Sequence, residues 1–118
     1  AEMARVCIYV FELLNLYNLK DIENGAVITP IQPAEAIGHP STGRIWLSVN
    51  GETRQDSDVA NLIWSVPEIV SDLSRFYHLE PGDLIYSGTP DGVGPVVAGD
   101  KIEGGIDGVG DVSLSIAN

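Results

Sequence analysis

The sequence predicts a small domain that is mainly β with some helix, an α+β fold class, and three observations carry this prediction. A chain of 118 residues is long enough for one domain with one core, because the fraction of surface buried on folding is modest at this size. Thirteen glycines and seven prolines separate short apolar runs, a spacing typical of strands and turns. Between two such runs lies Asn50-Gly51, the pair that favours a type I′ β-turn.

Charge and composition narrow the expected partners. The formal net charge of −11 argues against nucleic acid, because an acidic surface repels phosphates. The apolar run of residues 6–14 contains Glu12 and is shorter than the roughly 20 residues that a membrane helix needs, so we expect no membrane partner. Cys7 is the single cysteine, so no internal disulfide can form and we expect a cytoplasmic protein. Because Ala1 opens the chain without a helix cap or a turn, we also expect a piece of something longer.

The N-terminal third of the chain gives a mixed local pattern. Residues 1–19 are apolar almost all round and β-branched near their start, which indicates a buried helix or a strand that passes into a helix. Residues 20–25 are polar and predict a turn, and residues 26–28 predict a short strand that ends at Thr29-Pro30. Residues 32–44 predict an irregular loop.

A hairpin and two helices are predicted next. Residues 45–55 alternate around their central turn and predict the hairpin. Residues 56–58 offer carboxylate and hydroxyl oxygens to a helix start, with Ser57 as the N-cap. Pro67 begins the second helix, and Glu68 lies near the positive end of its dipole. The apolar residues of this helix recur at helical spacing, at Ile69, Val70, Leu73 and Phe76.

The C-terminal part alternates between turns and short strands. Residues 79–83 predict a turn that leads into a strand at residues 84–86, and residues 87–95 predict a long glycine-rich loop. Further short strands are predicted near Val96, near Ile102 and at residues 112–116.

The glycine-rich loop could be mistaken for a nucleotide-binding loop. Residues 88–94 lack the lysine and hydroxyl that follow the last glycine of a P-loop, and no helix pattern follows them, so we expect no nucleotide. One interpretation of the loop is a plain turn. A more specific one is that its backbone amides and the Thr89 hydroxyl hold a small carboxylate, because consecutive free amides form an anion-binding nest.

The other polar residues predict no catalytic site by themselves. His39 and His78 have no cysteine or histidine at metal-ligand spacing, so we expect both at the surface or in loops. No serine lies in a G-x-S-x-G elbow, which argues against a serine hydrolase triad. Asp56 and Asp58 form a compact acidic pair, but the predicted helix start uses their oxygens, so we predict no metal there.

Three segments together resemble the C-terminal half of fumarylacetoacetate hydrolase family proteins, most of all the fumarylpyruvate hydrolase branch. They are residues 45–55, 63–73 and 79–110, and their most specific motifs are VNGE-x-RQ, LEPGDLI and GTP-x-GVGP. The resemblance implies that residues 1–118 form a single domain, the C-terminal part of a mixed β-sandwich roll that is usually dimeric. It also implies Mg²⁺, Mn²⁺ or Ca²⁺ chelating a small dioxo-acid substrate, and a role in aromatic catabolism.

The resemblance further assigns roles to residues near the N-terminus. Lys20 matches the family's active-site lysine, and Arg5 matches an arginine that lies near substrate. Ala1 stands where the family has a metal-binding aspartate, and the family's E-x-E metal pair and His-Glu helix are absent from the sequence. No metal ligand is therefore assigned in this chain.

The matched residues have physical roles that follow from their chemistry. Lys20 beside a metal-bound 1,3-dioxo acid can stabilise the enolate that leaves when the carbon–carbon bond breaks. Thr89 and the amides around Gly88 can hold the substrate carboxylate, and Arg54 and Gln55 can reach the same pocket from the end of the hairpin. Two alternatives stay open, namely that Lys20 is a solvated turn residue and that Gln55 is a hairpin edge residue.

Three functions remain open at this point. The first is a hydrolase that cleaves a carbon–carbon bond in acylpyruvates, with a metal that polarises the oxo groups and activates water. The second is a catalytically inactive chain that at most forms a homodimer or binds small carboxylates, which Ala1 at the aspartate position favours. The third is an oxaloacetate decarboxylase or oxo-acid isomerase, since the same enolate chemistry serves those reactions. The enzymatic functions require Lys20 and Thr89 to face a common cavity.

Overall fold

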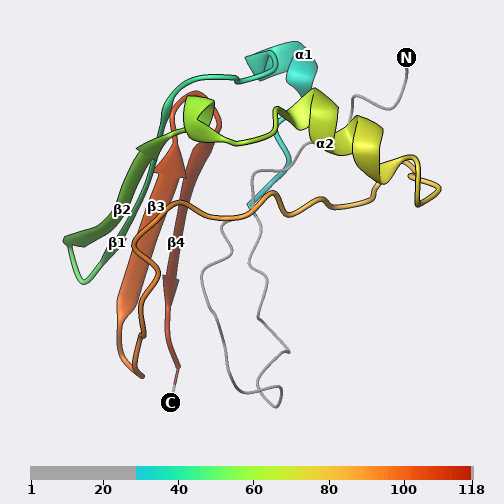
Figure 1. The fold of residues 1–118 in the computed structure, drawn as a ribbon. Helices are drawn as coiled ribbons and strands as arrows, with labels where there is room; N and C mark the ends of the chain where they lie inside the picture. The colour runs from blue at the N-terminus through green and yellow to red at the C-terminus, as the bar shows by residue number, and fades with distance from the viewer. Residues whose placement is uncertain (1–28, 118) are drawn as a thin grey trace.

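The computed structural model describes residues 29–117, and its centre is a four-stranded antiparallel sheet in the order β2-β1-β3-β4 (Figure 1). The predicted mainly β fold with some helix is therefore confirmed. The strands are β1 (Arg44–Val49), β2 (Glu52–Asp58), β3 (Lys101–Ile106) and β4 (Gly110–Ser115). The helices are α1 (Ala34–Ile37), α2 (Val66–Leu73) and a 3₁₀ helix (Val59–Asn61).

The predicted hairpin is confirmed as β1 and β2. Asn50 and Gly51 have φ angles of 52° and 80°, the positive values that a type I′ turn requires. The Asn50 side chain also joins this turn to the start of β3, because it donates to Asp100 Oδ1 at 2.8 Å and accepts from the Lys101 amide at 2.9 Å. A hydrogen bond from the Val97 amide and, to a smaller extent, the one from the Asn50 side chain lower the pKa of the Asp100 carboxylate.

The prediction of a helix start with Ser57 as its N-cap is wrong. Ser57 pairs with Ile45, and β2 continues to Asp58. A short 3₁₀ helix follows, and Asp58 caps it by accepting a hydrogen bond from the Ala60 amide at 2.8 Å. Pairing with β1, which the local sequence does not reveal, keeps Ser57 in a strand.

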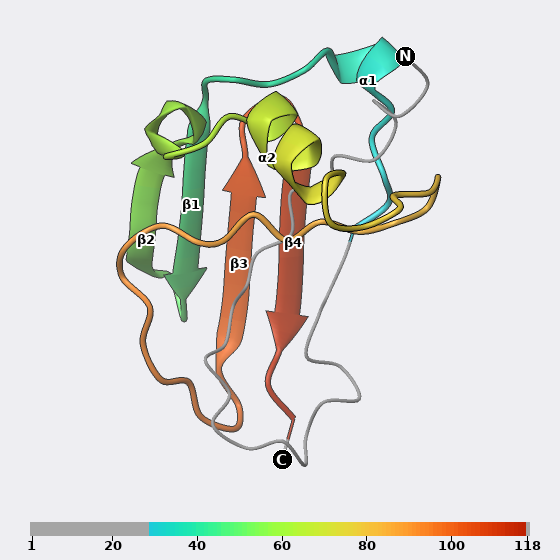
Figure 2. The same cartoon turned by 45° about the vertical axis from the view of Figure 1, so that its right-hand side comes forward.

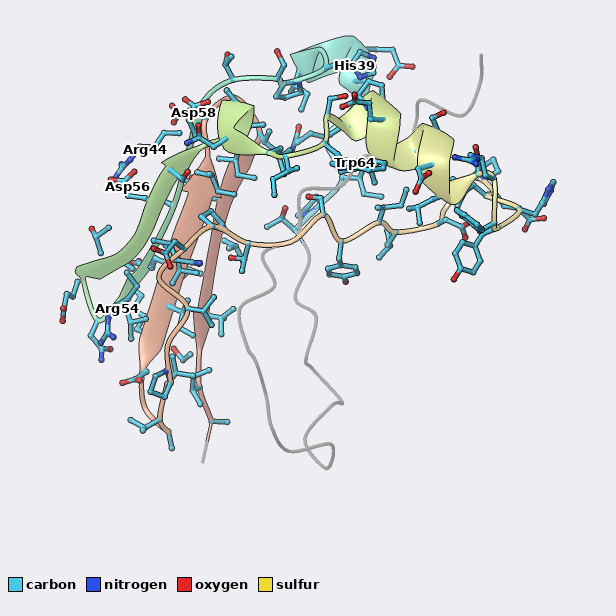
Figure 3. The ribbon with its side chains drawn as sticks, in the orientation of Figure 1. His39, Arg44, Arg54, Asp56, Asp58 and Trp64 are labelled. Carbon is cyan, nitrogen blue, oxygen red and sulfur yellow. The ribbon has the colours of Figure 1, made fainter. Side chains whose placement is uncertain are left out.

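An ion pair on the face of the sheet opposite Leu47 and Val49 helps to hold the end of β2 against β1. The Arg44 guanidinium donates to both oxygens of Asp56, at 2.8 and 3.0 Å, and the two residues lie side by side in Figure 3. Hydrogen bonding from Arg44 lowers the pKa of Asp56. Arg44 also lies over the Trp46 ring, 5.7 Å from its centroid. Both charged side chains are about half exposed, so water and salt weaken the attraction.

Helix α2 confirms the predicted helix and starts with a capping box. The Ser65 side chain accepts from the Glu68 amide, and the Glu68 carboxylate accepts from the Ser65 amide at 2.7 Å. These bonds satisfy amides that lack partners inside the helix, and the hydrogen bonds from Ser65 lower the pKa of Glu68. The helix ends at Leu73, so Phe76 lies beyond it and is 70% exposed.

The core lies on one face of the sheet. It contains the buried side chains of Leu47, Val49 and Ile102. Val49 pairs with Ile102 across β1 and β3, so these side chains project to the same face, as the alternation of strands requires. Partly buried apolar side chains pack against this cluster from β4 and the flanking segments, namely Val96, Leu114 and Ile116.

The segment between α2 and β3 crosses this same face. Figure 2 shows it passing in front of β4 and β3 to reach β2, and then turning down toward the start of β3. The loop predicted at residues 87–95 is confirmed, but the strands predicted at residues 84–86 and near Val96 are wrong. Val96 contributes its side chain to the core without pairing its backbone in the sheet. The predicted irregular loop at residues 32–44 contains α1.

The predictions for residues 1–19, 20–25 and 26–28 lie outside the residues that the structure describes. Within residues 29–117, none of the helices has the length and apolar character needed to cross a membrane.

The capping box predicts a loss of stability in the variant Ser65→Ala. Removing the capping oxygen should lower the free energy of unfolding by about 1 kcal/mol, measured by urea denaturation. Ser71→Ala is the matched control, because Ser71 is exposed inside the same helix and its change should stay within about 0.5 kcal/mol. Equal effects of the two substitutions would contradict the capping role.

Candidate binding site

Three of the predicted site residues come together where the glycine-rich loop crosses β2. The Gln55 amide nitrogen donates to Thr89 Oγ1 at 2.9 Å and to the Pro90 carbonyl oxygen at 2.6 Å. Gly88 lies next to Thr89 in the chain and has a φ of 95°. The structure thus places Gln55, Gly88 and Thr89 in one site, although Gln55 and Thr89 are 34 positions apart in the sequence.

The position of Gln55 on β2 explains why its side chain reaches the loop. Gln55 pairs with Leu47, so it projects toward the core face of the sheet, and it is only 4% exposed. The register shifts between Leu47 and Ser48, which leaves Arg54 as the extra residue of a β-bulge. Bulges bend a strand and redirect its side chains, and this one lies directly before Gln55.

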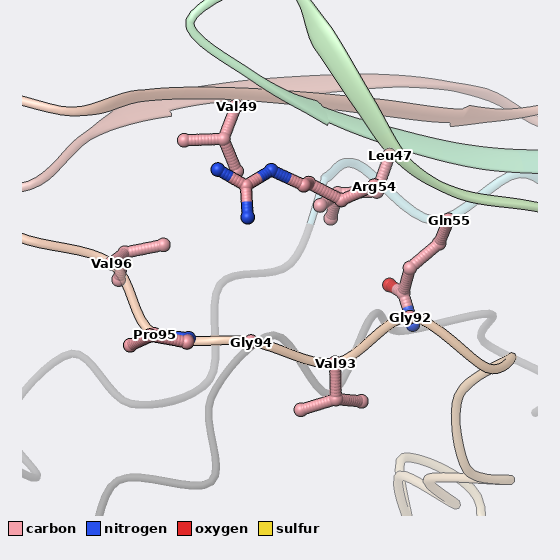
Figure 4. Close-up of a pocket in the computed structure, with 9 residues that line it drawn as sticks. All are labelled: Leu47, Val49, Arg54, Gln55, Gly92, Val93, Gly94, Pro95 and Val96. Atoms are coloured by element: carbon pink, nitrogen blue, oxygen red, sulfur yellow. The ribbon is translucent and has the colours of Figure 1, made fainter.

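Gly92 brings the loop against the backbone of β2. Its φ is 106°, and a Cβ atom at this position would overlap the carbonyl oxygen of Arg54. Only glycine fits here, because any side chain would collide with main-chain atoms that cannot rotate away. Figure 4 shows Gln55 reaching from β2 to the loop at Gly92.

The described residues line a smaller and a larger cavity along the loop. The smaller has a volume of about 20 Å³, lies between β2 and Gly92–Val96, and is lined by both Arg54 and Gln55. The larger has a volume of about 440 Å³, and Ser87–Pro90 form one side of it. Apolar side chains make up much of the remaining wall of the larger cavity, namely Ile45, Val59, Leu62, Ile63, Trp64 and Ile69.

The polar end of the larger cavity suits a carboxylate. Among the described residues, none accepts a hydrogen bond from the Gly88 or Thr89 amide, and the Thr89 hydroxyl lies beside them. Asp58 also lines the cavity, but its carboxylate accepts from the Gly43 and Ala60 amides. Two amides without an acceptor among the described residues, together with a hydroxyl at the end of an apolar cavity, can bind the carboxylate of a small organic acid.

Arg54 does not line the larger cavity with Thr89. Its side chain lines the smaller cavity (Figure 4). The guanidinium also lies 4.0 Å from the exposed carboxylate of Glu52. The expectation that Arg54 and Thr89 share a pocket is therefore wrong for this arrangement. Strict alternation would place Arg54 on the face opposite Gln55, but Arg54 is the extra residue of the bulge and lines the smaller cavity together with Gln55.

The remaining predicted site residues and metal ligands are not found in the described part of the chain. Lys20 and Arg5 lie outside residues 29–117, so their roles stay predictions. Within residues 29–117, no group of three histidine, cysteine or acidic side chains could hold a metal ion. The described residues therefore do not fit the divalent cation that the resemblance implies. His39 and His78 are both exposed, as predicted.

Comparison with known proteins identifies the family. The profile of the fumarylacetoacetate hydrolase C-terminal domain matches residues 9–117. The chain belongs to the fumarylacetoacetate hydrolase family. It is 55% identical over 97 residues to the fumarylpyruvate hydrolase of a Ralstonia species, a match that covers 82% of this chain and 50% of the relative.

Other members of the family are similar in sequence and in structure. The mitochondrial oxaloacetate tautomerase FAHD1 of Mus musculus is 46% identical over 90 residues, which are 76% of this chain and 41% of that protein. The crystal structure of Pseudomonas aeruginosa fumarylpyruvate hydrolase with Mn²⁺ and pyruvate has a TM-score of 0.77 and 52% identity, covering 79% of this chain and 40% of that one. This family member therefore spans half or less of the length of these relatives.

Sequence reasoning missed two features of the site. The Pro90 carbonyl accepts a bond from Gln55, and Gly92 lies against Arg54. Gly92 in the motif GTP-x-GVGP indicates that the backbone passes close to another segment, but the motif does not show which strand the loop approaches.

The close approach of Gly92 predicts a strong effect of the variant Gly92→Ala. The added Cβ and the positive φ should lower the free energy of unfolding by about 2 kcal/mol or more, measured by urea denaturation. Gly94→Ala is the matched control in the same loop, because its Cβ would meet only the Arg54 guanidinium, at 3.9 Å. A Gly92→Ala variant as stable as Gly94→Ala would contradict the contact between the loop and β2.

Proposed function

We propose that this chain is part of a hydrolase that cleaves a carbon–carbon bond in acylpyruvates, 1,3-dioxo acids such as fumarylpyruvate, and that its Thr89 loop binds the substrate carboxylate. The observation that carries the proposal is the position of Thr89, which lines the 440 Å³ cavity with its hydroxyl oxygen bonded to Gln55. The 55% identity to a fumarylpyruvate hydrolase supports the substrate class. The pyruvate in the Pseudomonas aeruginosa structure supports a site for a small oxo acid.

The proposal assigns a separate task to each part of the larger cavity. The Gly88 and Thr89 amides and the Thr89 hydroxyl bind the carboxylate by hydrogen bonds, which are strong when the acceptor is charged. The wall that contains Ile45 and Trp64 packs against the acyl arm and excludes water from it. We propose that Lys20 stabilises the enolate and that Arg5 lies near the substrate, as the sequence analysis predicts.

The proposed function includes a divalent cation, but no step can be assigned to it from the described residues. The Pseudomonas aeruginosa relative was crystallised with Mn²⁺, which supports a divalent metal in the complete site. Residues 29–117 do not supply a ligand cluster for it. The choice of Mg²⁺, the cytoplasmic location, the homodimer and the role in aromatic catabolism stay predictions, as does the assignment of the chain to one C-terminal catalytic domain.

A second candidate function is oxo-acid isomerisation or decarboxylation. The observation that favours it is the 46% identity to an oxaloacetate tautomerase. Both reactions pass through an enolate next to a carboxylate, so the Thr89 loop would serve either one. Assays with an acylpyruvate and with oxaloacetate separate the two candidates, and turnover of neither substrate would favour the inactive, carboxylate-binding alternative.

The proposal predicts that Thr89→Val weakens the binding of pyruvate. Calorimetric titration of the 118-residue chain with pyruvate, with and without Mn²⁺, should show affinity reduced by about tenfold or more, because a hydrogen bond to a charged group is lost. Thr89→Ser keeps the hydroxyl and should stay within about twofold of the original chain. Absence of pyruvate binding by the original chain, or equal affinity in Thr89→Val, would overturn the proposed carboxylate site.

A further inference from the structure

We infer that Gln55 is a positioning residue that orients the Thr89 hydroxyl, so that the hydroxyl proton is available to the bound carboxylate. The inference rests on the proposed function for the identity of the ligand. It gives Gln55 a different role from direct contact with substrate, because the side chain acts through Thr89. Three features of the described residues support it.

The first feature is the orientation of the Gln55 amide. The Pro90 carbonyl oxygen can only accept a hydrogen bond, so the group facing it at 2.6 Å must be the amide nitrogen of Gln55. The same nitrogen lies 2.9 Å from Thr89 Oγ1. An amide nitrogen has two protons and does not accept hydrogen bonds. The amide nitrogen therefore donates one hydrogen bond to the Pro90 carbonyl oxygen and the other to Thr89 Oγ1.

The second feature is the consequence for the Thr89 hydroxyl. Its oxygen accepts from Gln55, so its own proton cannot point at the Gln55 amide nitrogen. The proton must point elsewhere, and Thr89 lines the 440 Å³ cavity. A hydroxyl that accepts a hydrogen bond also becomes a better donor, since successive hydrogen bonds polarise one another. Gln55 thus prepares Thr89 to donate to an anion.

The third feature is the separation of Gln55 from the ligand. Gln55 lines the 20 Å³ cavity, and the larger cavity is lined on that side by the loop residues Ser87–Pro90. The side chain is 4% exposed and sits on a strand, next to the contact of Gly92 with Arg54. A buried amide on a rigid element is suited to fix the geometry of a residue that touches the ligand.

The variant Gln55→Glu tests this role. Its ionised carboxylate would have no proton to donate to Thr89 or Pro90, and it would accept the Thr89 hydroxyl proton itself. Pyruvate affinity, measured by titration calorimetry, should fall by about tenfold or more at pH 7.5. It should recover as the pH falls toward 5, because burial raises the pKa of a carboxyl group and the protonated form can donate one bond.

A double-mutant cycle with Thr89→Val distinguishes positioning from a general loss of structure. If Gln55 acts through the Thr89 hydroxyl, Gln55→Glu should change pyruvate affinity less than about twofold in the Thr89→Val background. Gln55→Leu is the second variant, in case the glutamate prevents folding. It should lower affinity by about fivefold, without recovery at low pH, and it should also lose most of this effect in the Thr89→Val background. Additive effects of Gln55 and Thr89 substitutions would overturn the inference.

A readout without ligand separates this inference from the proposed function. The NMR chemical shift of the Thr89 methyl group should change in both Gln55 variants and stay constant in Gln32→Leu, a change at an exposed glutamine. If the original chain binds no pyruvate but the Thr89 methyl shift changes in the Gln55 variants, the proposed carboxylate site is wrong and the contact between Gln55 and Thr89 is confirmed. An unchanged Thr89 shift in the Gln55 variants would overturn the positioning role.

Discussion

The hydrogen bonds from the Gln55 amide to Thr89 and Pro90 are the interaction on which the site depends. They join a buried position of the sheet to a loop that has no regular secondary structure. Such a loop lacks the ladder of backbone bonds that fixes a strand, so its shape must come from contacts with the rest of the protein. Gln55 supplies two of these contacts at the place where the loop meets the larger cavity.

The surrounding contacts complete the support of the loop. Gly92 lets the backbone of the loop lie directly on β2, and Asp100 holds its far end through the Val97 amide and Asn50. Gly92 joins the loop to β2. The Val97 amide joins the end of the loop to Asp100, which in turn binds Asn50 in the turn of the hairpin. The sheet therefore holds the loop in place, and the loop on its core face carries the polar groups that can bind a ligand.

Local sequence predicted the elements whose signals are local. The hairpin followed from Asn50-Gly51, and the helix after Pro67 followed from its apolar spacing. The predictions that were wrong concern segments whose structure depends on pairing with another strand. The segment at Ser57 stays in β2 because Ile45 lies opposite it, whereas residues 84–86 and Val96 find no pairing strand among the described residues. Whether a short apolar run becomes a strand depends on a partner that lies elsewhere in the sequence.

The candidate site shows the same limit. Motifs shared with the family marked Gln55, Gly88 and Thr89, and the structure brings these residues together. Gln55 faces the loop because it pairs with Leu47 on the core face, and Arg54 lines the same small cavity as Gln55 as the extra residue of a bulge. No pattern in the sequence shows that β2 has an extra residue at Arg54, because the bulge exists only relative to β1.

The most direct test of this account is an NMR measurement on the side-chain amide of Gln55 in the unmodified chain. The account predicts a nuclear Overhauser effect between the Gln55 amide protons and the Thr89 methyl group. It also predicts hydrogen exchange slower by about tenfold or more than at the exposed amide of Gln32. Exchange as fast as at Gln32, with no contact between Gln55 and Thr89, would contradict the claim that the sheet holds the binding loop in place.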